Sequence, residues 1–454
     1  MLLAFNLPPS ATYFNQVASL LGWGAWMSHP TSSSSRTPAL HKDVAAYVTL
    51  GLLIVVVGLP SVLDAQPWAL ALSAAALVAS AALVVALGNV ASRNGLGSSM
   101  FLALCVAFLI AGLASCVIGI IQVYLPTWAD GDLIARSSVV GRSVGNLRQP
   151  NHLCSLLLWS IVAALWLGEA QFLRRALAIV FAGLMLFVVV LSGSRSGGLG
   201  ALLLAFWGLL DRRRARSTRV ALLLAPLAYG FFWIGATAWA PRGAHAFGGA
   251  GRFSATGDIS SSRFGIWSNT LDLIRTHPWF GVGFGEFNFA WTLTEFPNRP
   301  VAFFDHTHNL PLQLAVELGL ALAALVLATL GWALWRAARN CMLPPDPDEV
   351  ASPQRAAFVM VLLVLMHSLL EYPLWYAYFL LPTAFLLGLC VAGPTRCVVA
   401  AAPAPHVQVQ AMSVRIASLV LMLGAAYSIY DYFKVVVIFA PPDNASPLAE
   451  RIAA

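Results

Sequence analysis

The residues whose types best suit chemistry lie in the segment FFDHTHNLP, residues 303–311, where one residue separates two histidines. Histidine accepts a proton near neutral pH without a large shift of its pKa. The segment runs into an apolar stretch that carries Glu317 and Gly319. We therefore expect titratable imidazoles where a water-facing loop enters a membrane, in a position to act as a general base toward a hydroxyl acceptor.

His308 is favoured over His306 as the base. It directly precedes Asn309, which can orient it, and it opens the apolar stretch, whereas His306 lies further out in the loop. One of the two histidines is expected to have a structural role at the start of a helix. Together with Asp305 the pair could also hold zinc, but two imidazoles and one carboxylate are a minimal ligand set. The loop offers no obvious fourth ligand, so we predict no metal and no cofactor.

Arginine supplies the second kind of chemistry, because a planar guanidinium pairs with phosphate oxygens in bidentate fashion and keeps its charge. Arg195 lies in the turn LSGSRSGG, residues 191–198, between two apolar stretches. Its charge must stay near the membrane boundary, where an unpaired charge is costly and usually functional. We predict a diphosphate as its ligand. Arginines expected on the same side are Arg142, Arg148, Arg252, Arg263 and Arg275, for which pairing with lipid headgroups or with Asp258, Asp272 and Glu286 is an equal alternative.

The elements that position these residues are predicted to be transmembrane helices. Of 454 residues, 59% are apolar and only 10% are charged, which indicates an all-α polytopic membrane protein. Apolar runs of about 20 residues span a bilayer as a helix, and with the shorter runs they give about 12 transmembrane helices. The long runs are 44–64, 68–90, 100–125, 153–172, 219–240, 310–335, 374–394 and 414–438, and the shorter ones are 12–27, 176–192, 197–210 and 356–370.

Arginine also sets the expected orientation, since short cytoplasmic loops carry an excess of Lys and Arg. The run DRRRAR, residues 211–216, is the strongest mark of the inner side. Alternating spans then place 126–152, 192–198, 241–309 and the corner at 371–373 together on the outer side. In a bacterium this is the periplasmic face of the inner membrane. The net charge of +7 owes much to this topology, so membrane lipids are expected partners and nucleic acid is not.

The chain is thus divided into N-terminal transmembrane helices (1–240), a long periplasmic loop that contains helices (241–309) and C-terminal transmembrane helices (310–454). In the loop, serines 260–262 can cap a helix that ends at His277-Pro278. Its apolar residues at helical spacing predict an amphipathic helix that lies against the bundle or the membrane surface. They are Phe264, Trp267, Leu271 and Ile274.

A glycine-rich run, GVGFGE at residues 281–286, follows this helix. Its backbone N–H groups could cradle an anion. As a dinucleotide motif it is weak, because no strand precedes it and no helix clearly opens from it. We predict a plain flexible turn.

Several of these motifs resemble those of the O-antigen ligase and polymerase superfamily of membrane glycosyltransferases. They are Ser262-Arg263 through Trp267, the run HPWFGVG at 277–283, and His308-Asn309 with nine residues before Gly319. The resemblance implies en bloc transfer of a glycan from undecaprenyl diphosphate to a hydroxyl acceptor on the periplasmic face. It also implies inversion at the anomeric carbon without a metal. Carried over to this sequence, it gives His308 as the base and Arg195 and Arg263 as the residues that hold the diphosphate.

Two further stretches resemble the protein O-oligosaccharyltransferases: GNLRQPNHL at 145–153 and HSLLEYPLWY at 367–376. The expected acceptor is lipid A-core oligosaccharide, with a periplasmic protein such as a pilin, or a growing glycan, as alternatives. Polar residues at the membrane boundary are predicted to contact sugar or phosphate, and interhelical hydrogen bonds are the alternative. The substrate-binding set is Arg142, Arg148, Gln149, Asn151, His152, Arg275, His306, Asn309, Glu371 and Tyr372.

Two other interpretations remain open. Asp130-Gly131-Asp132 resembles the metal-binding DxD motif of another class of lipid-linked glycosyltransferases, although the two acids equally suit a solvated loop face. A secondary transporter would also have about twelve spans, but it normally places ionisable residues in the middle of a span. Here the polar residues gather at one boundary, which favours the enzyme.

Overall fold

The computed structural model describes residues 1–28, 68–240, 246–249, 259–297, 299–300, 304–342, 351–392, 405–440 and 447–453. Within these ranges the chain is helical and contains no strand, so the predicted all-α class is confirmed. The expected span 44–64 and Arg252 lie outside the described residues.

The helices follow most of the predicted apolar runs to within a few residues. The α-helices are α1 (Tyr13–Ser28), α3 (Trp68–Arg93), α4 (Gly97–Tyr124), α5 (Pro150–Glu169), α6 (Arg175–Leu191), α7 (Arg195–Leu210), α8 (Arg216–Trp239), α9 (Ile259–Thr276), α10 (Phe287–Leu293), α11 (Leu310–Leu318), α12 (Leu320–Met342), α13 (Pro353–Ser368), α14 (Ala377–Ala392), α15 (Pro405–Phe439) and α16 (Leu448–Ala453). Short 3₁₀ helices are η2 (Pro126–Trp128) and η4 (Pro373–Trp375).

Six helical segments of the described chain are long and apolar enough to cross a membrane. Four shorter apolar helices, α6, α7, α13 and α14, accompany them. The multi-pass membrane character is therefore clear, while the number of about 12 spans stays a prediction. The six segments are Leu72–Arg93, Gly97–Tyr124, Pro150–Glu169, Arg216–Trp239, Leu320–Met342 and Arg415–Phe439.

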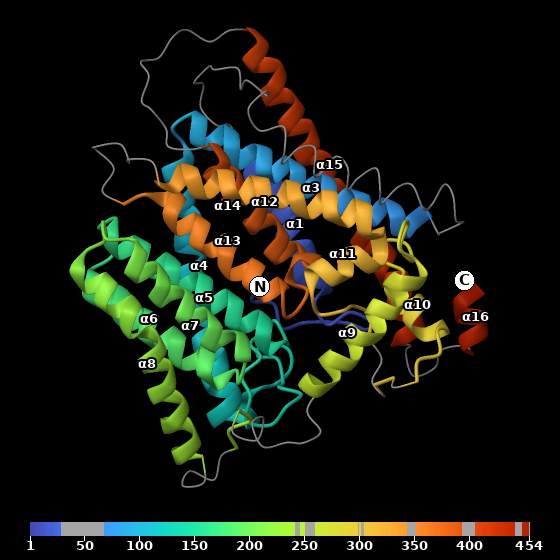
Figure 1. Cartoon of the computed structure of the whole chain (residues 1–454), viewed down its shortest axis with the longest axis horizontal. Coiled ribbons are helices and arrows are strands. Elements are labelled where there is room, and N and C mark those ends of the chain that lie inside the picture. Colours follow the sequence, from blue (N-terminus) through green and yellow to red (C-terminus); the bar gives the residue numbers. More distant parts are fainter. Residues whose placement is uncertain are drawn as a thin grey trace.

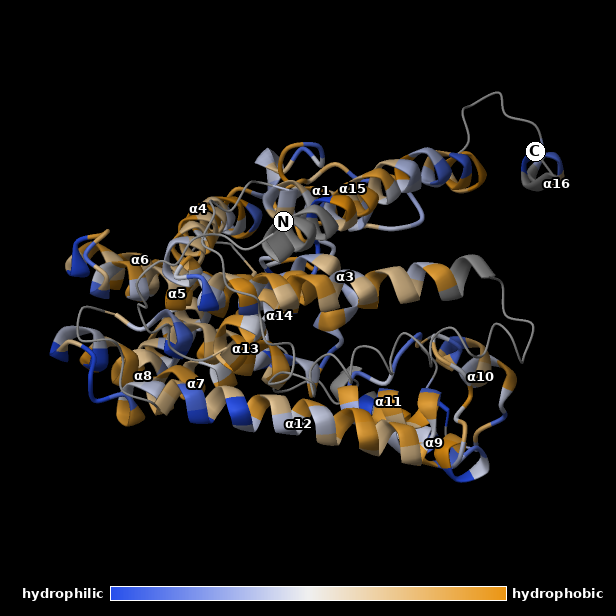
Figure 2. Cartoon of the chain, turned by 90° about the horizontal axis from the view of Figure 1, so that it is seen from above, coloured by the Kyte–Doolittle hydropathy of each residue, from blue (hydrophilic) through white to orange (hydrophobic). Residues whose placement is uncertain are grey.

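Helix α5 forms the centre of the bundle, because nearly all of its residues are buried. It packs against α4, α6, α7 and α13. Its Trp159 side chain is fully buried and donates a hydrogen bond from Nε1 to the carbonyl of Met360 on α13, at 2.8 Å. Figure 1 shows α4–α8 gathered on one side of the molecule and α9–α11 on the other, with α12–α14 running between them; Figure 2 shows the same division from above.

The predicted span 310–335 is broken at Gly319, where the backbone has φ of 77°. The chain therefore forms two helices, the nine-residue α11 and the longer α12. A side chain at Gly319 would collide with the backbone of Trp279, and the N–H of Leu320 donates to the carbonyl of Pro278 at 2.8 Å. The break joins α11 to the loop, and it leaves Glu317 outside the candidate spans.

Helix α9 forms where the sequence predicts it, but its buried face differs from the expected one. Ile266, Leu273 and Ile274 pack against Phe287, Trp291, Phe304 and Val316. Phe264 and Leu271 are exposed, and Trp267 is half-buried. Only part of the predicted apolar face thus packs against the protein, because the packing partners come from α10, α11 and the loop before α11 (residues 304–309).

Candidate active site

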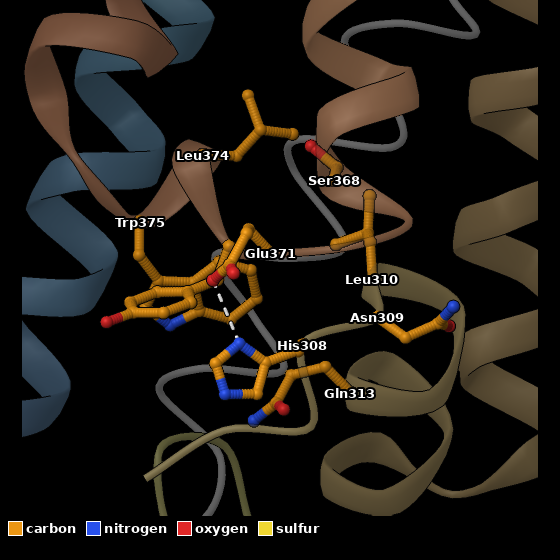
Figure 3. A pocket seen from close by; sticks show the side chains of 9 residues that line it. His308, Asn309, Leu310, Gln313, Ser368, Glu371, Leu374 and Trp375 are labelled. Atoms are coloured by element: carbon orange, nitrogen blue, oxygen red, sulfur yellow. Dashed lines mark hydrogen bonds and ion pairs between the residues drawn. The ribbon is translucent and has the colours of Figure 1, made fainter. Parts of the chain in front are cut away.

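Glu371 is the residue around which the candidate site is built. Its carboxylate accepts hydrogen bonds from His308 Nδ1 at 2.9 Å, Arg263 Nη2 at 2.6 Å and Asn151 Nδ2 at 2.8 Å. These partners come from segments far apart in the chain, and Figure 3 shows His308 pointing at the carboxylate. The carboxylate accepts the Nδ1 proton of His308, so the other ring nitrogen, Nε2, is left as the basic atom.

The local backbone explains how the two central residues meet. Glu371 follows the end of α13, where its N–H donates to the carbonyl of His367 at 2.9 Å. His308 has φ of 55°, a left-handed conformation that non-glycine residues seldom adopt. Asn309 then begins α11 as its N-cap, because its side-chain oxygen accepts from the N–H of Leu312. The chain thus turns sharply at the histidine before the helix starts.

The charge state of Glu371 follows from these contacts. Burial alone would raise its pKa, but the hydrogen bond that it accepts from His308 and the electrostatic attraction of its neighbours, Arg263 among them, outweigh burial and lower the pKa to about 2. Glu371 is therefore an anion at every usable pH. A fixed anion next to an imidazole holds the ring orientation and stabilises the ring when it takes a second proton.

An open cavity of about 200 Å³ lies beside this carboxylate. His308 and three arginines, Arg142, Arg195 and Arg263, share it. The arrangement places an imidazole and several permanent cations around one space large enough for a phosphate group. The remaining lining residues are Gln149, Pro150, Asn151, Ser196, Leu370 and Glu371.

Arg195 is exposed and stands at the first position of α7. Partial positive charge already accumulates at a helix N-terminus, so an arginine there is unfavourable unless an anion binds. Arg142 supports the turn that leads into this helix, because its Nε donates to the carbonyl of Ser192 at 2.8 Å. Ser194 in the same turn donates to Asn151 at 2.6 Å. Asn151 therefore ties the α7 turn to Glu371.

Sequence reasoning predicted a contact with substrate for Glu371 and missed its central role. The motif HSLLEYP placed it at the membrane boundary, but a local pattern does not show which distant side chains reach it. The expectation that Asn309 orients His308 was wrong, because Asn309 bonds to the backbone of Leu312 and Leu369 and Glu371 orients the ring.

Other predicted substrate-binding residues have contacts of their own. Arg148 Nη2 donates to the carbonyls of Ala4 and Gly131 at 2.8 and 3.3 Å. His152 is buried in α5 and bonds to the Tyr378 hydroxyl at 3.0 Å. Arg275 is exposed and pairs with Asp272. Arg148, His152 and Arg275 do not line the 200 Å³ cavity, which favours structural roles over contact with a ligand there.

Gln149 has both a structural contact and a place in the cavity. Its side chain caps α5 by accepting a hydrogen bond from the N–H of His152, and it also lines the cavity. Tyr372 lines a narrow adjoining pocket together with His308, Leu374 and Trp375; Figure 3 shows this pocket.

His306 is buried, and its Nδ1 contacts the carboxylate of Asp305. Burial lowers the pKa of His306, which suits the predicted structural role for one of the histidines. Its ring centroid lies 4.2 Å from that of His308. Together with Glu371 the two imidazoles offer three ligand atoms that lie within 4.8 Å of one another. The sequence suggests Asp305 as the carboxylate of such a set and does not indicate Glu371 as a metal ligand. The Arg263 cation, 2.6 Å from that carboxylate, opposes a divalent cation there.

The glycine-rich turn is explained by close packing. The N–H groups of Val282 and Gly283 donate to the carbonyls of Val316 and Glu317 at 2.8 and 3.1 Å. A side chain at Gly281 would collide with the backbone of Glu317. These N–H groups are used within the protein, so the turn is a packed element, contrary to the prediction of a plain flexible turn.

The DxD pattern also forms a local turn. One oxygen of Asp130 accepts from the N–H groups of Asp132, Leu133 and Ile134 at 3.0, 2.9 and 3.0 Å. This geometry favours the loop interpretation over the metal-binding one.

Comparison with known proteins identifies relatives of the chain. An O-antigen ligase family model matches residues 180–327, a model of the C-terminal part of a virulence-factor membrane-bound polymerase matches 355–452, and a protein glycosylation ligase model matches 144–167. A general O-oligosaccharyltransferase of Acinetobacter baylyi is 32% identical over 262 residues, and a ComP-specific O-oligosaccharyltransferase of the same organism is 26% identical over 267 residues.

The two matches cover 55% and 56% of this chain and 44% of each relative, so the chain spans about half the length of the curated relatives that it matches. The segments that the family models match carry most of the residues that line the cavity: Gln149, Pro150 and Asn151 lie in 144–167, Arg195, Ser196, Arg263 and His308 in 180–327, and Leu370 and Glu371 in 355–452. Over these segments the chain is similar to O-antigen ligases and O-oligosaccharyltransferases.

Proposed function

We propose that this protein is a membrane glycosyltransferase that transfers a glycan en bloc from undecaprenyl diphosphate to a hydroxyl acceptor on the periplasmic face. The observation that carries the proposal is the single cavity shared by the His308–Glu371 pair and three arginines. Its relatives' names, O-antigen ligase and O-oligosaccharyltransferase, support the same reaction class.

The geometry supports a single displacement. The acceptor oxygen attacks the anomeric carbon while the bond from that carbon to the diphosphate oxygen breaks and its electron pair leaves with the diphosphate. The acceptor proton passes to Nε2 of His308, and Glu371 stabilises the resulting imidazolium. Arg195 and Arg263 neutralise the negative charge that grows on the leaving group. Attack opposite to the leaving group inverts the anomeric carbon.

Arg263 has two roles in this proposal. In the absence of ligand its guanidinium pairs with Glu371, and with donor bound it shares its several N–H donors between the carboxylate and the diphosphate. No bound nucleotide or metal is needed, because the lipid diphosphate is already a competent leaving group once cations surround it.

For the acceptor, a hydroxyl of a periplasmic protein is favoured by the comparisons, since a protein glycosylation ligase model matches residues 144–167 and the two relatives named above are O-oligosaccharyltransferases. Lipid A-core oligosaccharide, the first expectation from sequence, is the second candidate and is favoured by the O-antigen ligase match over residues 180–327. A growing glycan would use the same residues. The base and the cations serve all three acceptors alike.

The test is a deletion strain complemented with the wild-type chain, His308→Ala or His277→Ala. His277 is the control, because it is an exposed histidine at the end of α9. Two products are scored together: lipopolysaccharide ladders and the glycoform mass of periplasmic protein. Wild type and the control should restore one product, and His308→Ala neither, at equal membrane abundance. Normal glycan attachment by His308→Ala would remove it as the base, and the product restored identifies the acceptor.

A further inference from the structure

The backbone of the base is held by a buried polar chain that leads away from the cavity. Thr307 precedes His308, is fully buried, and donates its N–H to Gln313 Oε1 at 2.7 Å. Gln313 in turn donates from Nε2 to Glu317 Oε1 at 2.8 Å. Gln313 and Glu317 are each 3% exposed. The two side chains lie one turn apart on α11, so they connect the residue before His308 to the C-terminal end of that helix.

Further hydrogen bonds hold Thr307, the residue before His308, from other sides. Trp267 on α9 donates from Nε1 to the carbonyl of Thr307 at 3.0 Å. The Thr307 hydroxyl donates to the carbonyl of Asn309 at 2.9 Å. A left-handed conformation at a non-glycine residue persists only when its surroundings over-determine it. These bonds surround His308 on both sides and therefore supply that constraint.

Glu317 is also built into the glycine-rich turn. Its carbonyl accepts from Gly283, and the neighbouring Val316 carbonyl accepts from Val282. Burial raises the pKa of the Glu317 carboxyl to about 7, with the N–H groups of Gly285 and Phe287 and the Gln313 amide partly offsetting burial. A buried carboxyl is costly to keep, yet nothing in the proposed displacement uses Glu317 directly.

We infer that Gln313 and Glu317 are positioning residues, which hold the strained backbone at His308 so that its imidazole faces both Glu371 and the cavity. The inference rests on the proposed role of His308 as the base. Gln313 is required as a side chain that accepts on one side and donates on the other. Glu317 fixes the orientation of the Gln313 amide. Its carboxyl oxygen, ionised or neutral, accepts a hydrogen bond from Gln313 Nε2, so Gln313 Oε1 is left to accept from the N–H of Thr307.

Four variants test this polarity. Gln313→Leu removes both bonds and should lower kcat by roughly 10- to 100-fold, as expected for a small misplacement of a catalytic group, with KM for the lipid-linked donor within about threefold. Glu317→Gln retains an acceptor oxygen and should stay within about threefold of wild type. Q313E alone brings two carboxyl groups together and should be impaired, whereas the double variant Q313E/E317Q restores the acceptor toward Thr307 and the donor between the two residues, and should recover activity.

A second readout does not depend on turnover. Hydrogen exchange in the peptide that contains residues 306–310 should speed up in Gln313→Leu, because the Thr307 N–H loses its acceptor, and should return to the wild-type rate in Q313E/E317Q. Matched controls are Gln354→Leu and Glu169→Gln, both buried residues in the part of the bundle near the arginine-rich turn at residues 211–216. Neither control should change exchange at 306–310.

The outcomes separate the two proposals. If His308→Ala retains transfer while Gln313→Leu accelerates exchange, the base assignment fails and the positioning of the loop stands. If His308→Ala is inactive but Gln313→Leu and Q313E match wild type in kcat and exchange, the positioning role is overturned. Failure of the double variant to recover either readout, with normal abundance in the membrane, also overturns it.

Discussion

Two carboxylates with little exposed side-chain surface, Glu371 and Asp211, lie near opposite ends of α7, and each bonds to arginine. Asp211 accepts from Arg214 at 3.2 Å and from Arg355 at 3.0 Å. The Arg214 guanidinium also lies over the Trp207 ring, 3.8 Å from its centroid. Both clusters thus combine an acid with cations drawn from different elements. The sequence alone does not distinguish these two clusters, because each is a group of charged residues between apolar segments.

The difference lies in what each carboxylate is given as a partner. Asp211 has two guanidinium groups, which keep their charge and exchange no proton. Glu371 has one guanidinium, one amide and one imidazole, and its cluster opens into a 200 Å³ cavity. A buried ion pair is therefore weak evidence for a site. A titratable partner and a cavity for a ligand are the two features that distinguish the Glu371 cluster, the candidate active site, from the Asp211 cluster.

The largest effect that should separate the two clusters is on turnover. Glu371→Gln keeps the shape but removes the anion that stabilises the imidazolium, so kcat should fall by roughly 10²- to 10⁴-fold. Asp211→Asn should leave kcat within about twofold while it lowers the thermal midpoint, because Arg214 and Arg355 lose a buried counter-ion. Initial rates and thermal unfolding in detergent measure both. Equal loss of turnover in the two variants would erase the distinction.

A smaller effect is expected for the cations of the cavity. Arg195→Lys and Arg263→Lys keep the charge but lose the bidentate fork, so transfer should fall roughly tenfold, mainly through kcat, because the charge that they neutralise grows in the transition state. Arg212→Lys, an exposed arginine in the arginine-rich turn, is the control and should be silent. Full activity in both cavity variants would argue that neither guanidinium touches the diphosphate.

The stability of the α11 region should depend modestly on pH. The pKa of Glu317 is raised from 4.5 to about 7 by burial, so the folded protein binds this proton more tightly than the unfolded chain. The stabilisation is full below pH 4.5 and is lost as the pH rises through about 7. Glu317→Gln stays neutral, so it should flatten the thermal midpoint against pH in this window. Parallel curves for the two proteins would contradict the raised pKa.

The smallest expected effect is that of a chelator. Turnover should be unchanged by EDTA, because Arg263 already supplies the positive charge beside Glu371. The assay compares washed membranes with and without EDTA, followed by zinc or manganese. Inactivation reversed by zinc would identify His306, His308 and Glu371 as metal ligands, and rescue by manganese alone would return attention to Asp130-Gly131-Asp132.

The sequence predicts much of the fold because apolar length and arginine placement are local properties. It also predicts that His308, Arg195 and Arg263 belong together, since the resemblance carries their motifs. It does not predict the break at Gly319, which depends on contact with Trp279. Nor does it show that Arg148 donates to the backbone of Ala4, because a contact between residues far apart in the chain produces no periodic pattern in the sequence. The sequence predicts Glu371 as a boundary residue, and only the three-dimensional contacts show that its carboxylate bonds to His308.

The left-handed backbone at His308 has a practical consequence for capturing complexes. Alanine at φ of 55° carries a penalty of roughly 1–2 kcal/mol, so His308→Ala perturbs the loop while it deletes the imidazole. Asparagine tolerates this conformation through its short polar side chain and cannot accept the acceptor proton. His308→Asn is accordingly the better inactive form in which to trap the lipid-linked donor and the acceptor together for imaging.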